Sequence, residues 1–129
     1  SPSESTPYSP SNTTSINPGK ILVFQDAVFY GELSPDGTRM TISLYLMLKN
    51  EGDRKVYITR IEVPDLNWIT AITDVVLNPG GTWSNSFFVA KDMPYTIEWE
   101  TGTEHTILVY FKVEGHPEEM SVGIKAVVV

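Results

Sequence analysis

The clearest pattern in the chain is an alternation of apolar and polar side chains from residue 39 to residue 50. One parity carries only large apolar residues, namely Met40, Ile42, Leu44, Leu46 and Leu48. Because successive side chains of a strand point to opposite faces of a sheet, this alternation predicts a strand with one face in the core. Tyr45 and Met47 lie on the opposite parity, so the outward face of this strand is also partly apolar.

Similar runs, rich in β-branched and aromatic residues, predict further strands. They span residues 20–33, 54–63, 68–77, 82–90, 96–100, 105–113 and 120–129. Turns rich in Gly, Pro, Asn and Asp separate them, as in SPDG at 34–37, NPGG at 78–81 and EGHPEE at 114–119. In the run 54–63, the apolar residues change from even-numbered to odd-numbered positions, which predicts a β-bulge near Thr59 and Arg60.

Seven or eight short strands with no amphipathic helix predict an all-β fold, an antiparallel β-sandwich. A small barrel is the structural alternative. The chain has 129 residues, of which 19% are charged, and this length is typical of one domain with one core.

Residues 1–19 differ from the rest in composition. Thirteen of these nineteen residues are Ser, Thr or Pro, and only Glu4 is charged, so we expect a mobile tether ahead of a folded domain at 20–129. Because the sequence starts at Ser1 without a basic or apolar leader, we interpret it as a product of processing or truncation. The tether holds an N-glycosylation acceptor triplet at Asn12, which favours an extracytoplasmic location.

The formal net charge is −7, and no cluster of Lys and Arg offsets it, so nucleic acid is not an expected partner. The chain has no cysteine, which excludes disulfides and thiolate metal sites. Its two histidines, His105 and His116, do not form a zinc-ligand spacing. We therefore expect no metal and no cofactor.

Motifs of known catalytic mechanism are missing from the sequence. It has no G-x-S-x-G nucleophile elbow, no glycine-rich phosphate loop and no calcium-binding loop. Glu98 and Glu100 would share one face of the strand predicted at 96–100, which makes a paired-carboxylate hydrolase one alternative. A solvated strand face near Glu104 is the favoured explanation, and we expect no enzyme.

Large aromatic side chains are the main candidates for contact with a partner, because they stack on sugar rings and anchor protein interfaces. Trp68 follows a loop and is the first candidate, with Tyr95 and Trp99 beside other loops. The alternative role for Trp83 or Trp99 is to fill the core between the sheets.

The last strand is apolar on both parities, with Val127 and Val129 opposite Val128, whereas a free edge strand ordinarily carries charges. We therefore expect this edge to be covered, either by the first strand of the same chain or by a second copy. Together with Tyr45 and Met47, these valines predict a homodimer.

Three segments carry a family resemblance: LMLKNEGDRKVYITRIEV, LNPGGTWSNSFFVA, and GTEHTILVYFKVEG with MSVGIKAVVV. They resemble the immunoglobulin-like sandwich domains of archaeal cell-surface proteins, in which an apolar strand ends at an Asn-x-Gly turn and a Pro-Gly turn opens a later strand. In length, preceding tether and closing run of valines, residues 20–129 are similar to the soluble domain of the FlaF and FlaG family of archaellum (archaeal flagellum) accessory proteins.

The resemblance implies an immunoglobulin-like β-sandwich outside the cytoplasmic membrane, held by one N-terminal membrane helix. It implies a stator function, in which the domain contacts the S-layer and associates with itself, without catalytic residues. The membrane helix lies outside this sequence, since no run here approaches about 18 apolar residues.

We therefore expect a non-enzymatic anchoring module located between the cytoplasmic membrane and the S-layer, with the S-layer or another envelope protein as its partner. A carbohydrate-binding domain that uses Trp68 and Tyr95 is the first alternative, together with other surface-adhesion roles. FlaF, FlaG and a surface-protein repeat all fit these features.

Overall fold

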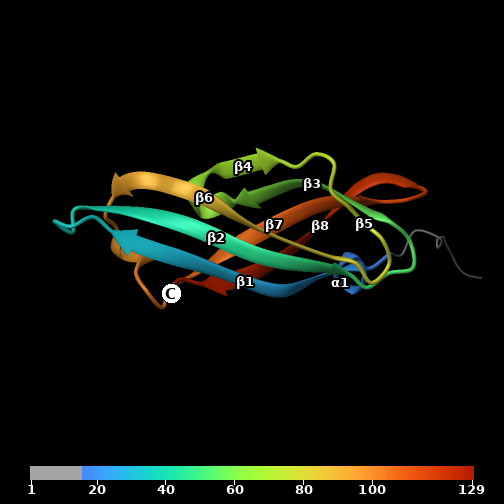
Figure 1. Cartoon of the computed structure of the whole chain (residues 1–129), viewed down its shortest axis with the longest axis horizontal. Helices are drawn as coiled ribbons and strands as arrows, with labels where there is room; N and C mark the ends of the chain where they lie inside the picture. The colour runs from blue at the N-terminus through green and yellow to red at the C-terminus, as the bar shows by residue number, and fades with distance from the viewer. Residues whose placement is uncertain (1–15) are drawn as a thin grey trace, which may run out of the picture.

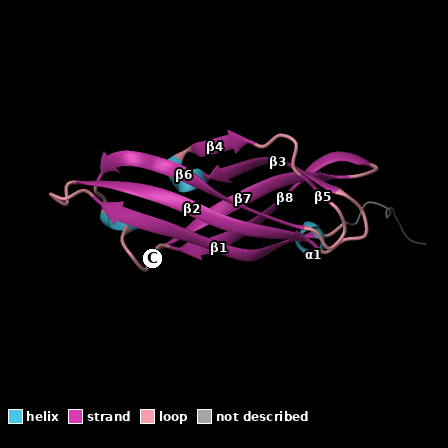
Figure 2. Cartoon of the chain, viewed as in Figure 1, coloured by secondary structure: helices cyan, strands magenta, loops and turns pink. Residues whose placement is uncertain are grey.

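The computed structural model describes residues 16–129, which form eight β-strands in two facing sheets (Figure 1). The strands are β1 (Leu22–Leu33), β2 (Arg39–Asn50), β3 (Val56–Val63), β4 (Trp68–Ala71), β5 (Val76–Leu77), β6 (Thr82–Pro94), β7 (Glu104–Val113) and β8 (His116–Val127). The helical segments are short (Figure 2): α1 (Pro18–Ile21) and the 3-10 turns η2 (Pro64–Leu66) and η3 (Ile97–Trp99).

The two sheets are antiparallel and form the predicted sandwich. One has the strand order β1-β2-β6, and the other has the order β4-β3-β7-β8, with β5 pairing with β3. The separation of β2 and β6 from β3, β7 and β8 is the arrangement of an immunoglobulin-like sandwich, which confirms the fold class. Within residues 16–129 one parallel bridge, between Phe29 and Val128, links the sheets, and the small barrel is not formed.

The inner faces of the two sheets form one core. The apolar parity of β2 is buried as predicted, and it faces the buried residues of β3 and β7: Val56, Ile58, Ile61, Val63, Ile107, Val109, Phe111 and Val113. Burying one large apolar side chain contributes about 1.5–3 kcal/mol, so these alternating strands dominate the stability of the fold.

The β-bulge predicted near Thr59 and Arg60 is confirmed. The register between β3 and β7 shifts between Ile58 and Arg60. The extra residue restores the inward orientation, and both Ile58 and Ile61 are buried although they differ in parity.

The SPDG turn reverses the chain as predicted. Gly37 has a φ of 75°, and its N–H donates to the carbonyl of Ser34 at 2.9 Å. The carboxylate of Asp36 accepts hydrogen bonds from the hydroxyls of Ser34 at 2.7 Å and Thr38 at 2.8 Å. These bonds, the one from Ser34 first, lower the pKa of Asp36 from 3.8 to about 2.

The strand predicted at 96–100 is wrong, because the chain forms η3 there. The N–H groups of Trp99 and Glu100 each donate to the carbonyl three residues earlier, at 3.2 Å. The hydroxyl of Thr96 caps this turn by accepting from the N–H of Glu98 at 3.3 Å. An alternation over five residues is too short to distinguish a strand from a capped 3-10 turn.

Three strand boundaries also differ from the prediction. β6 continues to Pro94 through the predicted loop, and the run at 68–77 divides into β4 and β5. The predicted turn at 114–119 occupies only Glu114 and Gly115, so β8 begins at His116.

Asn50, at the end of β2, is fully buried and satisfies its side-chain hydrogen-bonding groups. Its Nδ2 donates to the carbonyl of Arg54 at 2.7 Å and to that of Leu77 at 2.9 Å. Its Oδ1 accepts from the N–H of Gly52 at 2.9 Å. One side chain therefore joins the β2–β3 turn to β5.

The first strand covers the end of the last strand. This confirms the first of the two predictions for this edge, cover by the same chain. The N–H of Val129 donates to the carbonyl of Phe29 at 2.8 Å, and the N–H of Gly31 donates to the carbonyl of Val129 at 3.2 Å. Val128 is buried between them.

At the predicted boundary between tether and domain, the side chain of Asn17 caps α1 by accepting from the N–H of Gly19 at 3.1 Å. The remainder of the predicted tether, including Asn12, lies outside the described residues. No helix within residues 16–129 has the length and apolar character needed to cross a membrane.

Candidate functional site

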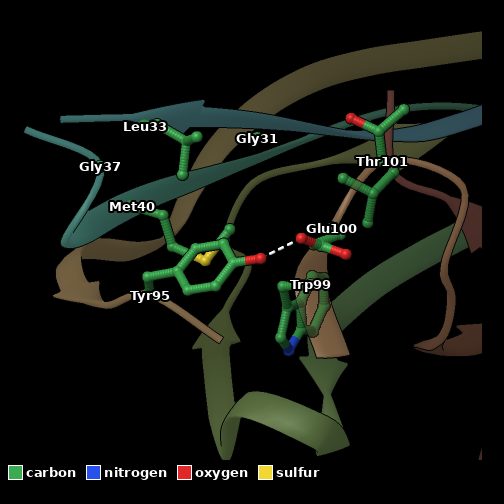
Figure 3. A pocket seen from close by; sticks show the side chains of 9 residues that line it. Gly31, Leu33, Gly37, Met40, Tyr95, Trp99, Glu100 and Thr101 are labelled. Carbon is green, nitrogen blue, oxygen red and sulfur yellow. Dashed lines mark hydrogen bonds between the residues drawn. The ribbon is translucent and has the colours of Figure 1, made fainter. Parts of the chain in front are cut away.

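A pocket of about 500 Å³ opens where β1 ends and β2 begins. Its lining comprises Gly31, Leu33, Gly37, Met40, Tyr95, Trp99, Glu100, Thr101 and Val128 (Figure 3). Sites for small ligands commonly have volumes of about 300–1,000 Å³. The fold thus brings together Tyr95 and Trp99, two of the three residues predicted to contact a partner.

The polar groups of the pocket centre on one hydrogen bond. The hydroxyl of Tyr95 points toward Glu100 and donates to its Oε2 (Figure 3). This bond raises the pKa of Tyr95, assisted by partial desolvation and by the carboxylate charge. The phenol is therefore protonated at neutral pH, and its hydrogen is already used. Tyr95 and Glu100 can therefore only accept further hydrogen bonds, so a group bound beside them has to be a donor.

Backbone hydrogen bonds hold both of these residues in place. The N–H of Tyr95 donates to the carbonyl of Thr38 at 3.0 Å, which ties it to the β1–β2 turn. The carbonyl of Glu100 accepts from the N–H of Thr103 at 3.1 Å and from its hydroxyl at 2.7 Å. The N–H of Val128 donates to the carbonyl of Thr103 at 2.9 Å, so the end of the last strand supports the same loop.

The other side chains of the pocket are largely apolar. Leu33 and Met40 lie beside the Tyr95 ring (Figure 3). Gly31 forms part of the pocket wall without a side chain. A Cβ atom there would come into ordinary van der Waals contact, at 3.4 Å from Val128 and 3.8 Å from the carbonyl oxygen of Trp99, and would fill this space. The pocket thus combines a largely apolar lining with the carboxylate of Glu100 and the hydroxyls of Tyr95 and Thr101.

Trp99 supports the pocket from the core, with only 3% of its surface exposed. Its indole stacks on the imidazole of His105 and meets the edge of Phe29 at a centroid distance of 5.0 Å. His105 Nδ1 lies 2.6 Å from Asp65 Oδ2, and its Nε2 lies 2.7 Å from the carbonyl oxygen of Glu98. The ring donates to both acceptors when both nitrogens carry protons.

Trp68, the first sequence candidate, lies outside this pocket. It is half-buried, and its ring packs at a centroid distance of 5.5 Å from Phe87. Trp83 lies 6.4 Å from the same ring, which places both tryptophans against the side of the core formed by β6. The structure does not bring Trp68 and Tyr95 together in one pocket.

The two carboxylates proposed for a hydrolase do not share a strand face, because η3 replaces the predicted strand. Glu100 lines the pocket, whereas Glu98 does not. Among the residues that the structure describes, no group of three or more His, Asp or Glu side chains is placed to hold a metal ion.

A second feature is the outward surface of the three-stranded sheet. Strand pairing places one set of apolar side chains there, which we call the outer apolar face: Val28, Tyr30, Tyr45, Met47 and Phe88. Tyr30 is 51% exposed and Phe88 is 60% exposed, while the other members are half-buried. Tyr45 and Met47, predicted to mediate self-association, thus belong to a larger patch.

Two exposed aromatic rings stand on either side of a small residue in this patch. Ser43 pairs with Tyr30 on β1 and with Phe88 on β6. A shallow hollow of about 80 Å³ lies there, lined by Ser43, Ser86, Phe87 and Phe88.

Val129 at the C-terminus extends the outer apolar face across β1. Phe29 and Val128 are bridged and buried, so their neighbours along each strand point outward. This register places Val129 beside Tyr30, and Val127 and Val129 are 38% and 51% exposed. Tyr45, Met47 and Val129 therefore lie on or beside the outer apolar face, whereas Val127 pairs with Glu104 on β7 of the other sheet.

Sequence reasoning missed Tyr30 and Phe88 on this face, and Leu33 and Met40 in the pocket. The signal for Tyr30 is present, because its parity in the first strand is opposite to that of Phe29. The pocket residues come from distant segments, and no local pattern marks them.

Comparison with protein-family models and with curated proteins finds no match to this chain.

Proposed function

We propose that this domain is a non-enzymatic anchoring module of the archaeal cell envelope, a stator component of the archaellum that binds the S-layer protein. The outer apolar face carries the proposal. Soluble monomers seldom expose a contiguous apolar patch of large side chains, and such patches mark sites of protein association. The resemblance of residues 20–129 to the FlaF and FlaG family supports the choice of partner and a location between the cytoplasmic membrane and the S-layer.

Self-association uses the outer apolar face together with Val129. A strand of 12 residues such as β2 is about 40 Å long, and three strands are about 15 Å wide, which gives about 600 Å². Standard interfaces bury about 800 Å² on each partner, and the outer apolar face is only part of this outward surface. A dimer therefore also buries Val129 and neighbouring polar side chains such as Thr41 and Lys49. Dimerisation presents two copies of the remaining surface to the envelope, which strengthens anchoring through avidity.

Co-sedimentation with isolated S-layer protein tests the anchoring function. The chain is incubated with S-layer sheets at acidic and at neutral pH, and an unrelated β-sandwich of similar charge serves as the control. We expect specific pelleting of this chain at one or both pH values. If the chain stays in the supernatant at both, as the control does, the anchoring function is wrong.

A carbohydrate-binding module is the second candidate, and the paired rings of Tyr30 and Phe88 around Ser43 favour it. Aromatic rings spaced on a sheet face stack on sugar rings. Titration with soluble glycans, followed by NMR, distinguishes this function: saturable shifts at Ser43 that Phe88→Ser abolishes support it. Substitution of Trp68 by Ala in the same titration tests the candidate named from the sequence.

A further inference from the structure

The pocket beside Tyr95 holds a carboxylate without a cationic partner. The ion pairs formed within residues 16–129 do not include Glu100, and no Lys or Arg lines the pocket. Arg39 follows the β1–β2 turn, but its Nε lies 2.9 Å from Asp92 Oδ1 and 3.0 Å from the carbonyl of the same residue. Residues 16–129 therefore supply no positive charge to this site.

We propose that the pocket receives the side chain of an arginine from a partner protein. Glu100 and the oxygen of Tyr95 accept hydrogen bonds only, and a guanidinium offers five donors in a planar arrangement. The ring of Tyr95 provides a face on which the guanidinium can stack. Leu33 and Met40 provide apolar surface for the methylene stem of the same side chain.

Other occupants fit this chemistry less well. A neutral apolar group would cover Glu100 without pairing its charge, which costs free energy, and an anion would be repelled by it. A lysine ammonium pairs with the carboxylate, but it does not stack on an aromatic face or bridge two acceptors in the way a guanidinium does. The net charge of −7 also favours association with a basic partner segment.

This site is separate from the outer apolar face and does not depend on the anchoring function. Its lining comes from the end of β1, the β1–β2 turn, the start of β2, the segment 95–101 and Val128, and it shares no residue with the outer apolar face. Failure of either proposal therefore leaves the other standing.

Titration of the ¹⁵N-labelled chain with short capped peptides tests the proposal by NMR. The probe is acetyl-Gly-Arg-Gly-amide. Its neutral control is the same peptide with citrulline, which keeps the shape of arginine without its charge, and a third peptide carries lysine. We expect saturable shifts at the amides of Gly31, Leu33 and Thr101, with a dissociation constant of about 1 mM or weaker for one side chain.

Three variants locate the interaction. Glu100→Gln is expected to weaken arginine-peptide binding about tenfold, which corresponds to about 1.4 kcal/mol. Glu98→Gln, on the same 3-10 turn but outside the pocket, is the matched control and keeps full affinity. Thr101→Arg supplies a cation within the chain at an exposed lining position and is expected to block the peptide while Glu100 is intact.

The proposal is overturned by any of four results: equal binding of the citrulline peptide, equal or tighter binding of the lysine peptide, unchanged affinity in Glu100→Gln, or no shifts at the pocket amides. Amide spectra of each variant verify that it is folded. Thr101→Arg keeps the test valid if Glu100→Gln fails to fold.

Discussion

The imidazole of His105 lies flat on the indole of Trp99, with ring centroids 3.4 Å apart and ring planes inclined by 8°. Both residue types are common in functional sites, yet this pair is buried under the pocket. His105 is also bound on both edges, to Asp65 on η2 and to the Glu98 carbonyl on η3. One side chain therefore fixes the two 3-10 turns relative to β7, and the pocket residue Glu100 directly follows η3.

Replacing His105 by Ala is expected to lower the free energy of unfolding by about 2–4 kcal/mol, because a cavity forms beside Trp99 and the imidazole no longer bridges Asp65 and the carbonyl of Glu98. Urea unfolding measures the change. His116→Ala is the control: its Nδ1 is buried without a hydrogen-bond partner, so its removal is not expected to lower the free energy of unfolding. Equal effects of the two substitutions would contradict a structural role for His105.

Asn50→Ala is expected to destabilise the domain by about 2–4 kcal/mol, since three backbone groups, one buried and two partly buried, lose their side-chain partner. The measurement is again urea unfolding. Asn85→Ala is the matched control, because Asn85 is exposed and its side chain bonds only the adjacent N–H of Ser86, at 2.8 Å. A loss below about 1 kcal/mol for Asn50→Ala would show that the β2–β3 turn and β5 do not depend on this side chain.

The sequence predicted β2 well because its alternation is strict over twelve residues and one face is fully buried. The parity change in β3 predicted its bulge, because the apolar residues before and after the bulge all have to point into the core. Residues 96–100 were mispredicted because the capping hydroxyl of Thr96 decides the local backbone there, and an alternation of five residues does not reveal a cap.

The pocket was only partly foreseeable. Tyr95 and Trp99 both line it, but Trp99 is buried against His105, which confirms the alternative prediction that this tryptophan fills the core. Leu33 and Val128 were not chosen, since alternation assigns a face to each residue without stating which strand ends meet. Their contact depends on the pairing of the C-terminus with β1, a relationship between residues about 100 positions apart.

Asp36 is expected to stabilise the folded state at neutral pH but not at strongly acidic pH. Its pKa in the folded state is about 2, below the ordinary 3.8, because Ser34 and Thr38 donate hydrogen bonds to the carboxylate. A lowered pKa stabilises the folded state above pH 3.8, and this contribution is lost as the pH falls toward 2. Asp36→Asn should therefore melt at a lower temperature than the unsubstituted chain at neutral pH, and the two melting curves should converge near pH 2. A constant difference across this range would exclude the hydrogen-bonded carboxylate as its source.

Tyr95 is expected to titrate at a higher pH than an unperturbed tyrosine, because ionisation breaks its bond to Glu100 and brings two negative charges together. Glu100→Gln removes that charge and should lower the pKa of Tyr95 toward its ordinary value. NMR of ¹³C-labelled tyrosine rings, with Tyr95 assigned through Tyr95→Phe, follows this titration. Glu98→Gln should leave it unchanged, and a shift of equal size in that control would rule out a specific hydrogen bond.

The outer apolar face is expected to mediate self-association. Phe88→Lys places a charge at its most exposed aromatic position, and desolvating an unpaired ammonium opposes dimer formation. Sedimentation velocity should therefore show a dimer for the unsubstituted chain and a monomer for Phe88→Lys at the same concentration. Ile69→Lys is the matched control, because Ile69 is similarly exposed, at 62%, but lies on β4 of the other sheet. A dimer that survives Phe88→Lys and dissociates in Ile69→Lys would move the interface to the opposite sheet, and a monomeric unsubstituted chain at all concentrations would remove self-association from the proposed function.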